Sequence, residues 1–233
     1  MALNETLKKI INTGTALPTS GTTGAPRRIF QPPHKLQAAN SVARQVQDIT
    51  VNSRILTVCT LEHAGGLLTQ TLPAVEVGAL VDIQKFNPYS WVRQITDYTH
   101  SHLTPDMARA VIKTRGFNTL NLSGITIMCG SDRVHSRIIQ SFIDRGATFI
   151  ANWGMTEVGP VAINSTFTPG DTVSLTESIM GDQIHCDTKI VDGELLVKVD
   201  ICVYDDWYHT GDLVTYNNRV YYYLGRIDAI RTK

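Results

Sequence analysis

Hydrophobic positions along the first two thirds of this chain alternate between the spacing of strands and the spacing of helices. Short apolar runs predict strands at residues 28–31, 55–59, 79–83, 102–103, 125–128 and 148–151. Apolar residues three or four positions apart predict helices at residues 4–11, 34–49, 66–77, 88–98, 105–114 and 132–144. Strands and helices that alternate in this way predict an α/β fold with a mostly parallel sheet and flanking helices.

The pattern changes after about Gly159, where we expect only short strands joined by hairpins. Residues 191–194 (Val-Asp-Gly-Glu) and 216–219 (Tyr-Asn-Asn-Arg) are typical of tight turns between strands. We therefore expect a small antiparallel, β-barrel-like subdomain at the end of the chain. The predicted division is a helix and loop hairpin at 1–33, an α/β subdomain at 34–160 and an antiparallel β subdomain at 161–233.

Composition excludes some classes of function. The chain has 233 residues with 21 basic and 21 acidic side chains, so its net charge gives no support to nucleic-acid or anionic-membrane binding. No apolar run approaches the ~20 residues of a membrane span, and residues 1–11 do not resemble a signal peptide. Four scattered cysteines favour buried, reduced thiols over disulfides or a metal site, and a cytoplasmic location.

A run of small and hydroxylated residues near the start of the chain is the first candidate for chemistry. Glycines allow a ligand to approach the main chain, hydroxyls and backbone N–H groups bind anions, and arginine adds a planar positive charge. The run comprises Thr19, Ser20, Gly21, Thr22, Thr23, Gly24, Ala25, Pro26, Arg27 and Arg28. It is either a polyphosphate-binding loop between two strands or a plain flexible turn, and it lacks the Lys-Ser/Thr of a P-loop.

A second candidate follows the strand predicted at 148–151, where ligands of parallel sheets bind. Asn152 and Trp153 offer a hydrogen bond and a stacking surface for a flat base, and Gly154 follows them. Thr156 is a donor for phosphate and Glu157 a carboxylate for Mg²⁺. The alternative is a core tryptophan followed by an ordinary polar loop.

Two further segments lie in the predicted β region. Asp212 follows a Thr-Gly turn, in a position to accept two hydrogen bonds from a ribose diol, although it also fits an ordinary β-turn. Tyr223, Arg226 and Asp228 lie at the end of this region. Each segment is a weak signal by itself.

Taken in order, these segments resemble the adenylate-forming superfamily of acyl-CoA synthetases, luciferases and peptide-synthetase adenylation domains. The resemblance rests on Thr-Ser-Gly-Thr-Thr-Gly-x-Pro-Arg, Trp-Gly-x-Thr-Glu, Asp-Gly-Glu-Leu, Tyr-x-Thr-Gly-Asp and Gly-Arg-x-Asp, and spans residues 18–228. It implies ATP and Mg²⁺ as cofactors and the conversion of a small carboxylic acid to an acyl-adenylate, with release of pyrophosphate.

The resemblance also implies roles for single residues. The loop at 19–24 would hold the β- and γ-phosphates, with Arg27 in place of the family's lysine. Trp153 would stack on adenine in place of the usual tyrosine, Thr156 would contact the α-phosphate, and Glu157 would bind Mg²⁺. The ribose would contact Asp212, near Arg226 and Tyr223. The acid would be bordered by His63, Gly130 and Ser131.

The family's upstream α/β subdomain and C-terminal lid, with its lysine, are missing from the match. We therefore expect either a minimal adenylating enzyme or a non-catalytic ATP- or AMP-binding module, such as an accessory subunit completed by a partner chain. A scaffold with decayed sites is a third possibility, opposed by the retention of Glu157, Asp212 and Arg226. A homodimer or a partner protein would cover the face left by the missing subdomain.

Overall fold

The computed structural model describes residues 2–19, 27–174 and 178–228. The strands are β1 Thr15–Pro18, β2 Arg28–Gln31, β3 Arg54–Thr57, β4 Leu80–Ile83, β5 His100–Leu103, β6 Thr126–Cys129, β7 Thr148–Met155, β8 Gly159–Phe167, β9 Ile179–Gly181, β10 Gln183–Ile184, β11 Asp187–Val191, β12 Glu194–Lys198, β13 Tyr208–Asn217 and β14 Val220–Arg226. The helices are α1 Ala2–Thr13, α2 Pro33–Gln47, α3 Ala64–Gly66, the π-helical η1 Leu67–Thr71, α4 Leu72–Glu76, α5 Pro88–Gln94, α6 Pro105–Ile112 and α7 Ser136–Ile143, with 3₁₀ turns η2 Ile95–Asp97 and η3 Arg115–Thr119.

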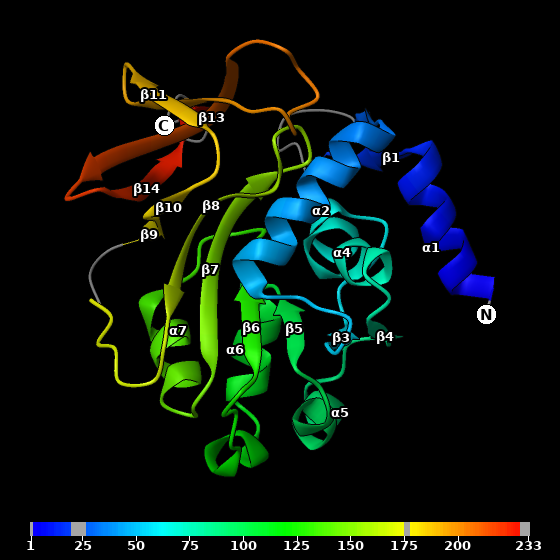
Figure 1. The fold of residues 1–233 in the computed structure, drawn as a ribbon. Helices are drawn as coiled ribbons and strands as arrows, with labels where there is room; N and C mark the ends of the chain where they lie inside the picture. Colours follow the sequence, from blue (N-terminus) through cyan, green and yellow to red (C-terminus); the bar gives the residue numbers. More distant parts are fainter. Residues whose placement is uncertain (1, 20–26, 175–177, 229–233) are drawn as a thin grey trace.

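The largest sheet has seven strands in the order β10-β8-β7-β6-β5-β3-β4 (Figure 1). The five strands from β4 to β7 are parallel, and β8 and β10 add to the edge in antiparallel register. Helices α5, α6 and α7 pack on one face of this sheet through Trp91, Val111 and Phe142. Helix α2 packs on the other through Ala43, which contacts Met128 and Ile150. The predicted α/β class with a mainly parallel sheet is therefore confirmed.

Successive residues of the central strands enter different cores. Ile127 belongs to the core under α7, whereas Met128 belongs to the core under α2. This alternation explains why the strands read as continuous apolar runs: both faces are covered by helices.

The second sheet is antiparallel, with the order β11-β12-β13-β14-β9. Both predicted hairpins are present. Asp192 and Gly193 have φ of 50° and 81°, and Asn218 and Arg219 have φ of 50° and 67°, as tight two-residue hairpin turns require. The sheet lies above the end of the large sheet at which β6 and β7 finish (Figure 1).

Three expectations about elements need correction. Strand β8 has nine residues and pairs with β7, so it belongs to the large sheet and is not one of the short hairpin strands expected after Gly159. The predicted helix 132–144 begins only at Ser136, because Ser131 has a φ of 74° and the chain there forms a loop. Strand β7 continues to Met155, so Asn152, Trp153 and Gly154 lie within the strand and not beyond its end.

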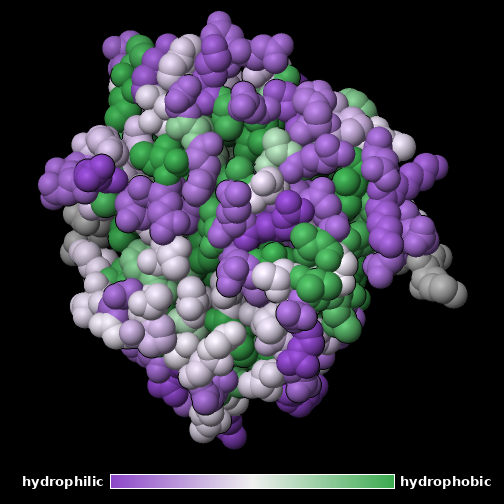
Figure 2. Space-filling view, viewed as in Figure 1, coloured by the Kyte–Doolittle hydropathy of each residue, from purple (hydrophilic) through white to green (hydrophobic). Residues whose placement is uncertain are grey.

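The strand order reverses direction between β3 and β5. Strand β4, which follows β3 in the chain, lies on one side of β3, and β5, which follows β4, lies on the other side. Ligands of open α/β sheets bind at the carboxyl ends of strands that flank such a switch. Among the described residues, no helix combines the length and apolar character needed to cross a membrane. The face in Figure 2 shows several separate apolar groups among polar residues, and not one large apolar patch.

Candidate active site

A cleft of about 1250 Å³ opens between the carboxyl ends of the parallel strands and the second sheet. Its walls come from the segments after β3, β5 and β6, from the end of β7, and from β13 and β14. Segments as far apart in sequence as Thr19 and Asp228 thus meet in one place. Of the residues predicted from the sequence, the cleft is lined by Thr19, His63, Ser131, Asn152, Trp153, Gly154, Thr156, Glu157, Asp212, Tyr223 and Arg226.

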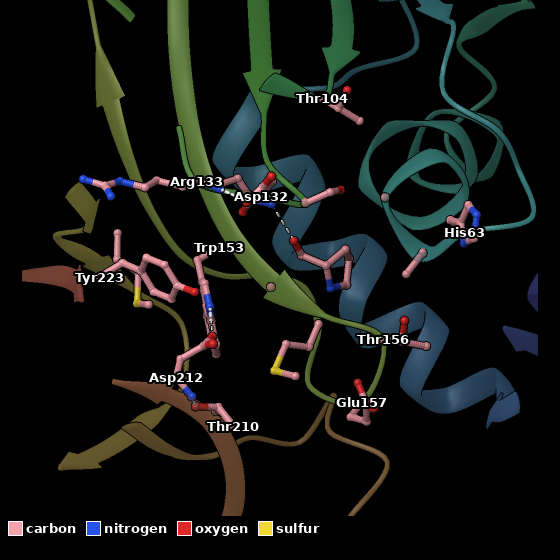
Figure 3. Close-up of a pocket in the computed structure, with 18 of the residues that line it drawn as sticks. His63, Thr104, Asp132, Arg133, Trp153, Thr156, Glu157, Thr210, Asp212 and Tyr223 are labelled. Atoms are coloured by element: carbon pink, nitrogen blue, oxygen red, sulfur yellow. Dashed lines mark hydrogen bonds between the residues drawn. The ribbon is translucent and has the colours of Figure 1, made fainter. Parts of the chain in front are cut away.

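Three predicted residues form one hydrogen-bonded unit at the seam between the two sheets. The indole Nε1 of Trp153 donates to Oδ2 of Asp212 at 2.8 Å (Figure 3). Nη1 of Arg226 donates to Oδ1 of the same carboxylate at 3.0 Å and to the carbonyl of Thr210 at 2.8 Å. Each carboxylate oxygen accepts one hydrogen bond here, and it keeps a further lone pair for a hydroxyl donor.

Two opposing effects act on the pKa of Asp212. Its carboxyl is only 5% exposed, and burial raises the pKa because the charged form loses hydration. The hydrogen bond from Trp153 and the charge of Arg226 lower it, and Asp228 raises it slightly. The two donors therefore stabilise the ionised carboxylate in a site that would otherwise favour its neutral form.

The turn before Asp212 is fixed by Glu194, at the start of β12. Oε1 of Glu194 accepts from the backbone N–H of Gly211 at 2.9 Å, and Oε2 lies 2.9 Å from Nδ1 of His209. Gly211 has a φ of 72°, and a Cβ there would lie 2.8 Å from Nη2 of Arg226. Only glycine therefore permits both this turn and the close approach of Arg226.

The predicted phosphate-binding loop is carried by the β1–β2 hairpin. Residues 20–26, which include Ser20, Gly21, Thr22, Thr23 and Gly24, lie outside the described residues. The neck of the hairpin is closed by a hydrogen bond from the backbone N–H of Thr19 to the carbonyl of Arg27 at 2.8 Å. The expectation that the loop joins two strands is confirmed by the pairing of β1 with β2.

This hairpin is tied directly to the turn that follows β7. The buried side chain of Gln31 donates through Nε2 to the carbonyl of Thr156. The hydroxyl of Thr156 donates to the carbonyl of Pro18 at 3.3 Å. Thr156 is therefore held beside the neck of the loop.

Glu157 lies in the same turn, half-buried at the rim of the cleft (Figure 3). Burial of the phenol, together with the negative charge of Glu157, raises the pKa of Tyr208. The described residues contain no cluster of three or more metal-ligating side chains. A single carboxylate still fits Mg²⁺ that is held mainly by water and substrate phosphates, so Glu157 is compatible with that ion.

The residues predicted around the acid divide into two groups. His63, an exposed residue before α3, and Ser131, in the loop after β6, both border the cleft. Gly130 does not line it. A Cβ at Gly130 would lie 2.6 Å from the carbonyl of Asn152, so this glycine allows the end of β6 to pack against β7.

Arg27 and Asn152 differ in part from their predicted roles. The Arg27 side chain is exposed and is not among the described residues that line the cleft. The amide of Asn152 donates to the carbonyl of Pro160 at 2.6 Å, which joins β7 to β8. Sequence reasoning assigned no role in the site to His102, Gln31 or Tyr208. Of these, Tyr208 carried a usable signal, because it is the first residue of the Tyr-x-Thr-Gly-Asp motif.

Comparison with known proteins agrees with this arrangement. The sequence profile of a family described as AMP-binding enzyme matches residues 15–203. An indoleacetate–CoA ligase of Aromatoleum aromaticum is 29% identical over 226 residues, which are 84% of this chain and 44% of that protein. A feruloyl-CoA synthase of an Amycolatopsis species is 25% identical over 239 residues, 88% of this chain and 48% of that protein. The chain thus spans about half the length of these curated relatives.

Solved structures show the same fold. An anthranilate CoA ligase in complex with anthranoyl-AMP matches with a TM-score of 0.78 at 19% identity, covering 91% of this chain and 47% of that one. An O-succinylbenzoate coenzyme A synthetase from Bacillus subtilis, in complex with AMP, matches with a TM-score of 0.76 at 22% identity, covering 94% and 50%. With its profile match over most of the chain and its cleft between two sheets, the protein belongs to the AMP-binding enzyme family, within the adenylate-forming superfamily.

Proposed function

We propose that this chain is an AMP-forming acid ligase, which binds ATP and a small carboxylic acid in the cleft and joins them as an acyl-adenylate. The observation that carries the proposal is the Trp153–Asp212–Arg226 unit, two hydrogen bonds that orient one buried carboxylate beside an indole ring. The carboxylate is suited to the two hydroxyls of a ribose. The ring is suited to stacking on adenine.

The phosphates would lie between this unit and the β1–β2 hairpin. Thr156 is fixed there by its contacts with Pro18 and Gln31, and its hydroxyl would turn to the α-phosphate. Glu157 would hold Mg²⁺, which neutralises phosphate charge when bound. We assign phosphate contacts to the loop at 20–24, with Arg27 as a nearby positive charge.

In the reaction, a carboxylate oxygen of the acid would attack the α-phosphorus of ATP, and the bond to the β-phosphate oxygen would break to release pyrophosphate. No general base is needed, since a carboxylic acid is already ionised near neutral pH. The chain's contribution is to hold the two reactants in line and to exclude water.

A second function, ATP or AMP binding without turnover, is favoured by the small number of cationic side chains among the described residues of the cleft. The described residues that line it include two arginines, Arg133 and Arg226, but no lysine. Arg226 is already engaged by Asp212, which leaves little mobile positive charge for the departing pyrophosphate. A partner chain would then have to supply that charge.

The two functions are separated by measuring nucleotide binding and turnover on the same preparation. Isothermal titration calorimetry with AMP and ATP tests binding, and exchange of labelled pyrophosphate into ATP across a panel of carboxylic acids tests adenylation. Binding with exchange supports the ligase, and binding without exchange, for any acid at high protein concentration, supports the binding module. Asp212→Ala should abolish binding, whereas Asp205→Asn, on an exposed loop, should not.

We also propose that a second copy or a partner protein covers part of the surface. The observations that support it are β4, the outer strand of the large sheet, and Leu80 on it, whose side chain is 56% exposed. Light scattering with size-exclusion chromatography tests this, and a monomer at all concentrations would contradict the homodimer.

A further inference from the structure

A buried histidine borders the acid-binding side of the cleft without a hydrogen-bond partner. His102 lies on β5, between Thr57 of β3 and Met128 of β6, and it is only 4% exposed. Its position is at the carboxyl end of a strand that flanks the switch in strand order. It is also one of the residues that line the cleft.

Neither ring nitrogen of His102 makes a hydrogen bond with another described residue. The contrast with His100, two positions earlier on the same strand, is direct. His100 is also buried, but its Nδ1 lies 2.7 Å from the hydroxyl of Thr99 and its Nε2 lies 2.8 Å from the carbonyl of Gln47. Buried polar groups are almost always paired, so an unpaired one at a cleft points to a partner that comes with the ligand.

Glycine at position 65 lets the main chain pass close to the ring. A Cβ added at Gly65 would lie 3.2 Å from Cε1 of His102 and 2.7 Å from Oγ of Ser131. Gly65, His102 and Ser131 therefore converge from three separate segments, and all three line the cleft. Cys59 and Met107, whose sulfur atoms are 3.7 Å apart, add an apolar wall.

Gly65, His102 and Ser131 lie at the end of the cleft away from Thr156 and Glu157, which we assign to the phosphates. Figure 3 shows Thr104, two residues after His102, on the opposite side of the pocket from Thr156 and Glu157. An acid whose carboxylate reaches the α-phosphate near Thr156 would direct the rest of its structure toward His102.

The charge state of the ring limits what it can recognise. Burial lowers the pKa of His102 to about 4. The ring is therefore neutral near pH 7 and offers one N–H donor and one nitrogen acceptor. A neutral donor–acceptor pair in an apolar wall suits an uncharged polar group and gives no charge to balance a second carboxylate.

We propose that His102 hydrogen-bonds an uncharged polar group of the acid, a hydroxyl or a ring N–H, at the end remote from the reacting carboxylate. The preferred substrates are then acids with an apolar body and one such terminal group. This inference rests on the proposed function, because it takes the cleft as the site of the acid.

The test compares two non-reactive acyl-adenylate analogues, acyl-sulfamoyl adenosines that differ only in a terminal substituent. One carries a 4-hydroxyphenylacetyl group and the other a 4-methylphenylacetyl group, which are nearly equal in shape. We expect the unmodified chain to bind the hydroxyl analogue about tenfold more tightly or better, as a hydrogen bond in a buried site provides. His102→Phe should abolish or reverse this preference, and His102→Gln, which keeps a neutral donor and acceptor, should retain part of it.

Met107→Leu is the matched control, because it changes the same wall without a polar group and should alter both affinities alike. AMP affinity reports on folding and on the nucleotide site in every variant. Equal preference in the unmodified chain and His102→Phe, with normal AMP binding, would overturn the inference alone. Failure of the unmodified chain to bind AMP or either analogue would overturn the proposed function, and the inference with it.

Discussion

The indole Nε1 of Trp153 lies 2.8 Å from Oδ2 of Asp212, which joins a strand of the large sheet to a strand of the small one. By its resemblance to the adenylate-forming superfamily, this position is usually tyrosine. Tryptophan here does two things: it offers a ring for a base, and its N–H supports the carboxylate assigned to the ribose. The residues that we propose to bind the base and the ribose are thereby coupled.

This coupling predicts the effect of Trp153→Phe. The variant keeps an aromatic face but removes the N–H donor, so AMP binding should weaken by about tenfold or more, as expected for a hydrogen bond to a charged group. Calorimetry with AMP measures the change. Trp91→Phe is the control, because Trp91 donates to Ser101 in the core under α5 and should alter stability without altering AMP affinity.

The same variant should change the pH dependence of AMP binding. The hydrogen bond from Trp153 lowers the pKa of Asp212 against the effect of burial, so its removal should raise that pKa. AMP affinity is expected to fall as acidification protonates Asp212, and this fall should begin at a higher pH in Trp153→Phe. Identical midpoints in the two proteins would show that the indole does not support the ionised carboxylate.

Gly211 and Gly193 offer a matched pair of glycines in the second sheet. Both have positive φ, 72° and 81°, so alanine is strained at either, by about 1 kcal/mol or more of unfolding free energy. A Cβ at Gly211 also lies 2.8 Å from Nη2 of Arg226, whereas at Gly193 the nearest atom, Cδ2 of Leu213, is 3.5 Å away. Gly211→Ala should therefore reduce AMP affinity, and Gly193→Ala should reduce only the free energy of unfolding, as chemical denaturation and calorimetry would show.

The contact of Gln31 with Thr156 predicts that its loss affects ATP affinity more than AMP affinity. Its side chain is 2% exposed and holds the β1–β2 hairpin to the carbonyl of Thr156. Gln31→Met keeps the length of the side chain but not the hydrogen bond, so the hairpin should lose its fixed position. The affinity for ATP should then fall more than the affinity for AMP. Phe30→Ala, on the outward face of the same strand, should leave the ratio of the two affinities unchanged. Equal weakening of ATP and AMP by Gln31→Met would contradict a role in placing the β- and γ-phosphates.

The burial of His102 predicts part of the pH dependence of the free energy of unfolding. Its pKa is lowered from 6.5 to about 4 by burial, so between these values the unfolded chain binds a proton that the folded chain does not. The free energy of unfolding should therefore fall as the pH drops from about 6.5 to about 4, by up to roughly 3 kcal/mol at about 1.4 kcal/mol per pH unit. In His102→Leu this contribution should disappear, while Met107→Leu should keep it. Urea denaturation across this pH range measures both.

The sequence by itself determined the order of elements and indicated the family. Strand and helix spacing predicted the parallel sheet, since burial of both faces leaves continuous apolar strands between amphipathic helices. Turn residues predicted hairpins within residues 191–194 and 216–219. The second turn is centred on Asn218 and Arg219, one position later than the Asn-Asn pair that predicted it. The ordered motifs indicated the adenylate-forming family, because five short segments resemble that family's motifs in the same order.

Only the tertiary structure decided which of those groups meet and which do not. It brought Trp153, Asp212 and Arg226 together across two sheets, and it showed that Gly130 serves packing and does not line the cleft. It assigned β8 to the large sheet, where pairing with β7 overrides the local hairpin pattern. It also revealed His102, whose role depends on unpaired nitrogens at a cleft and not on any motif. The physical reason is the same in each case: local spacing fixes the conformation of a segment, whereas burial and hydrogen-bond partners are properties of segments that are distant in the sequence.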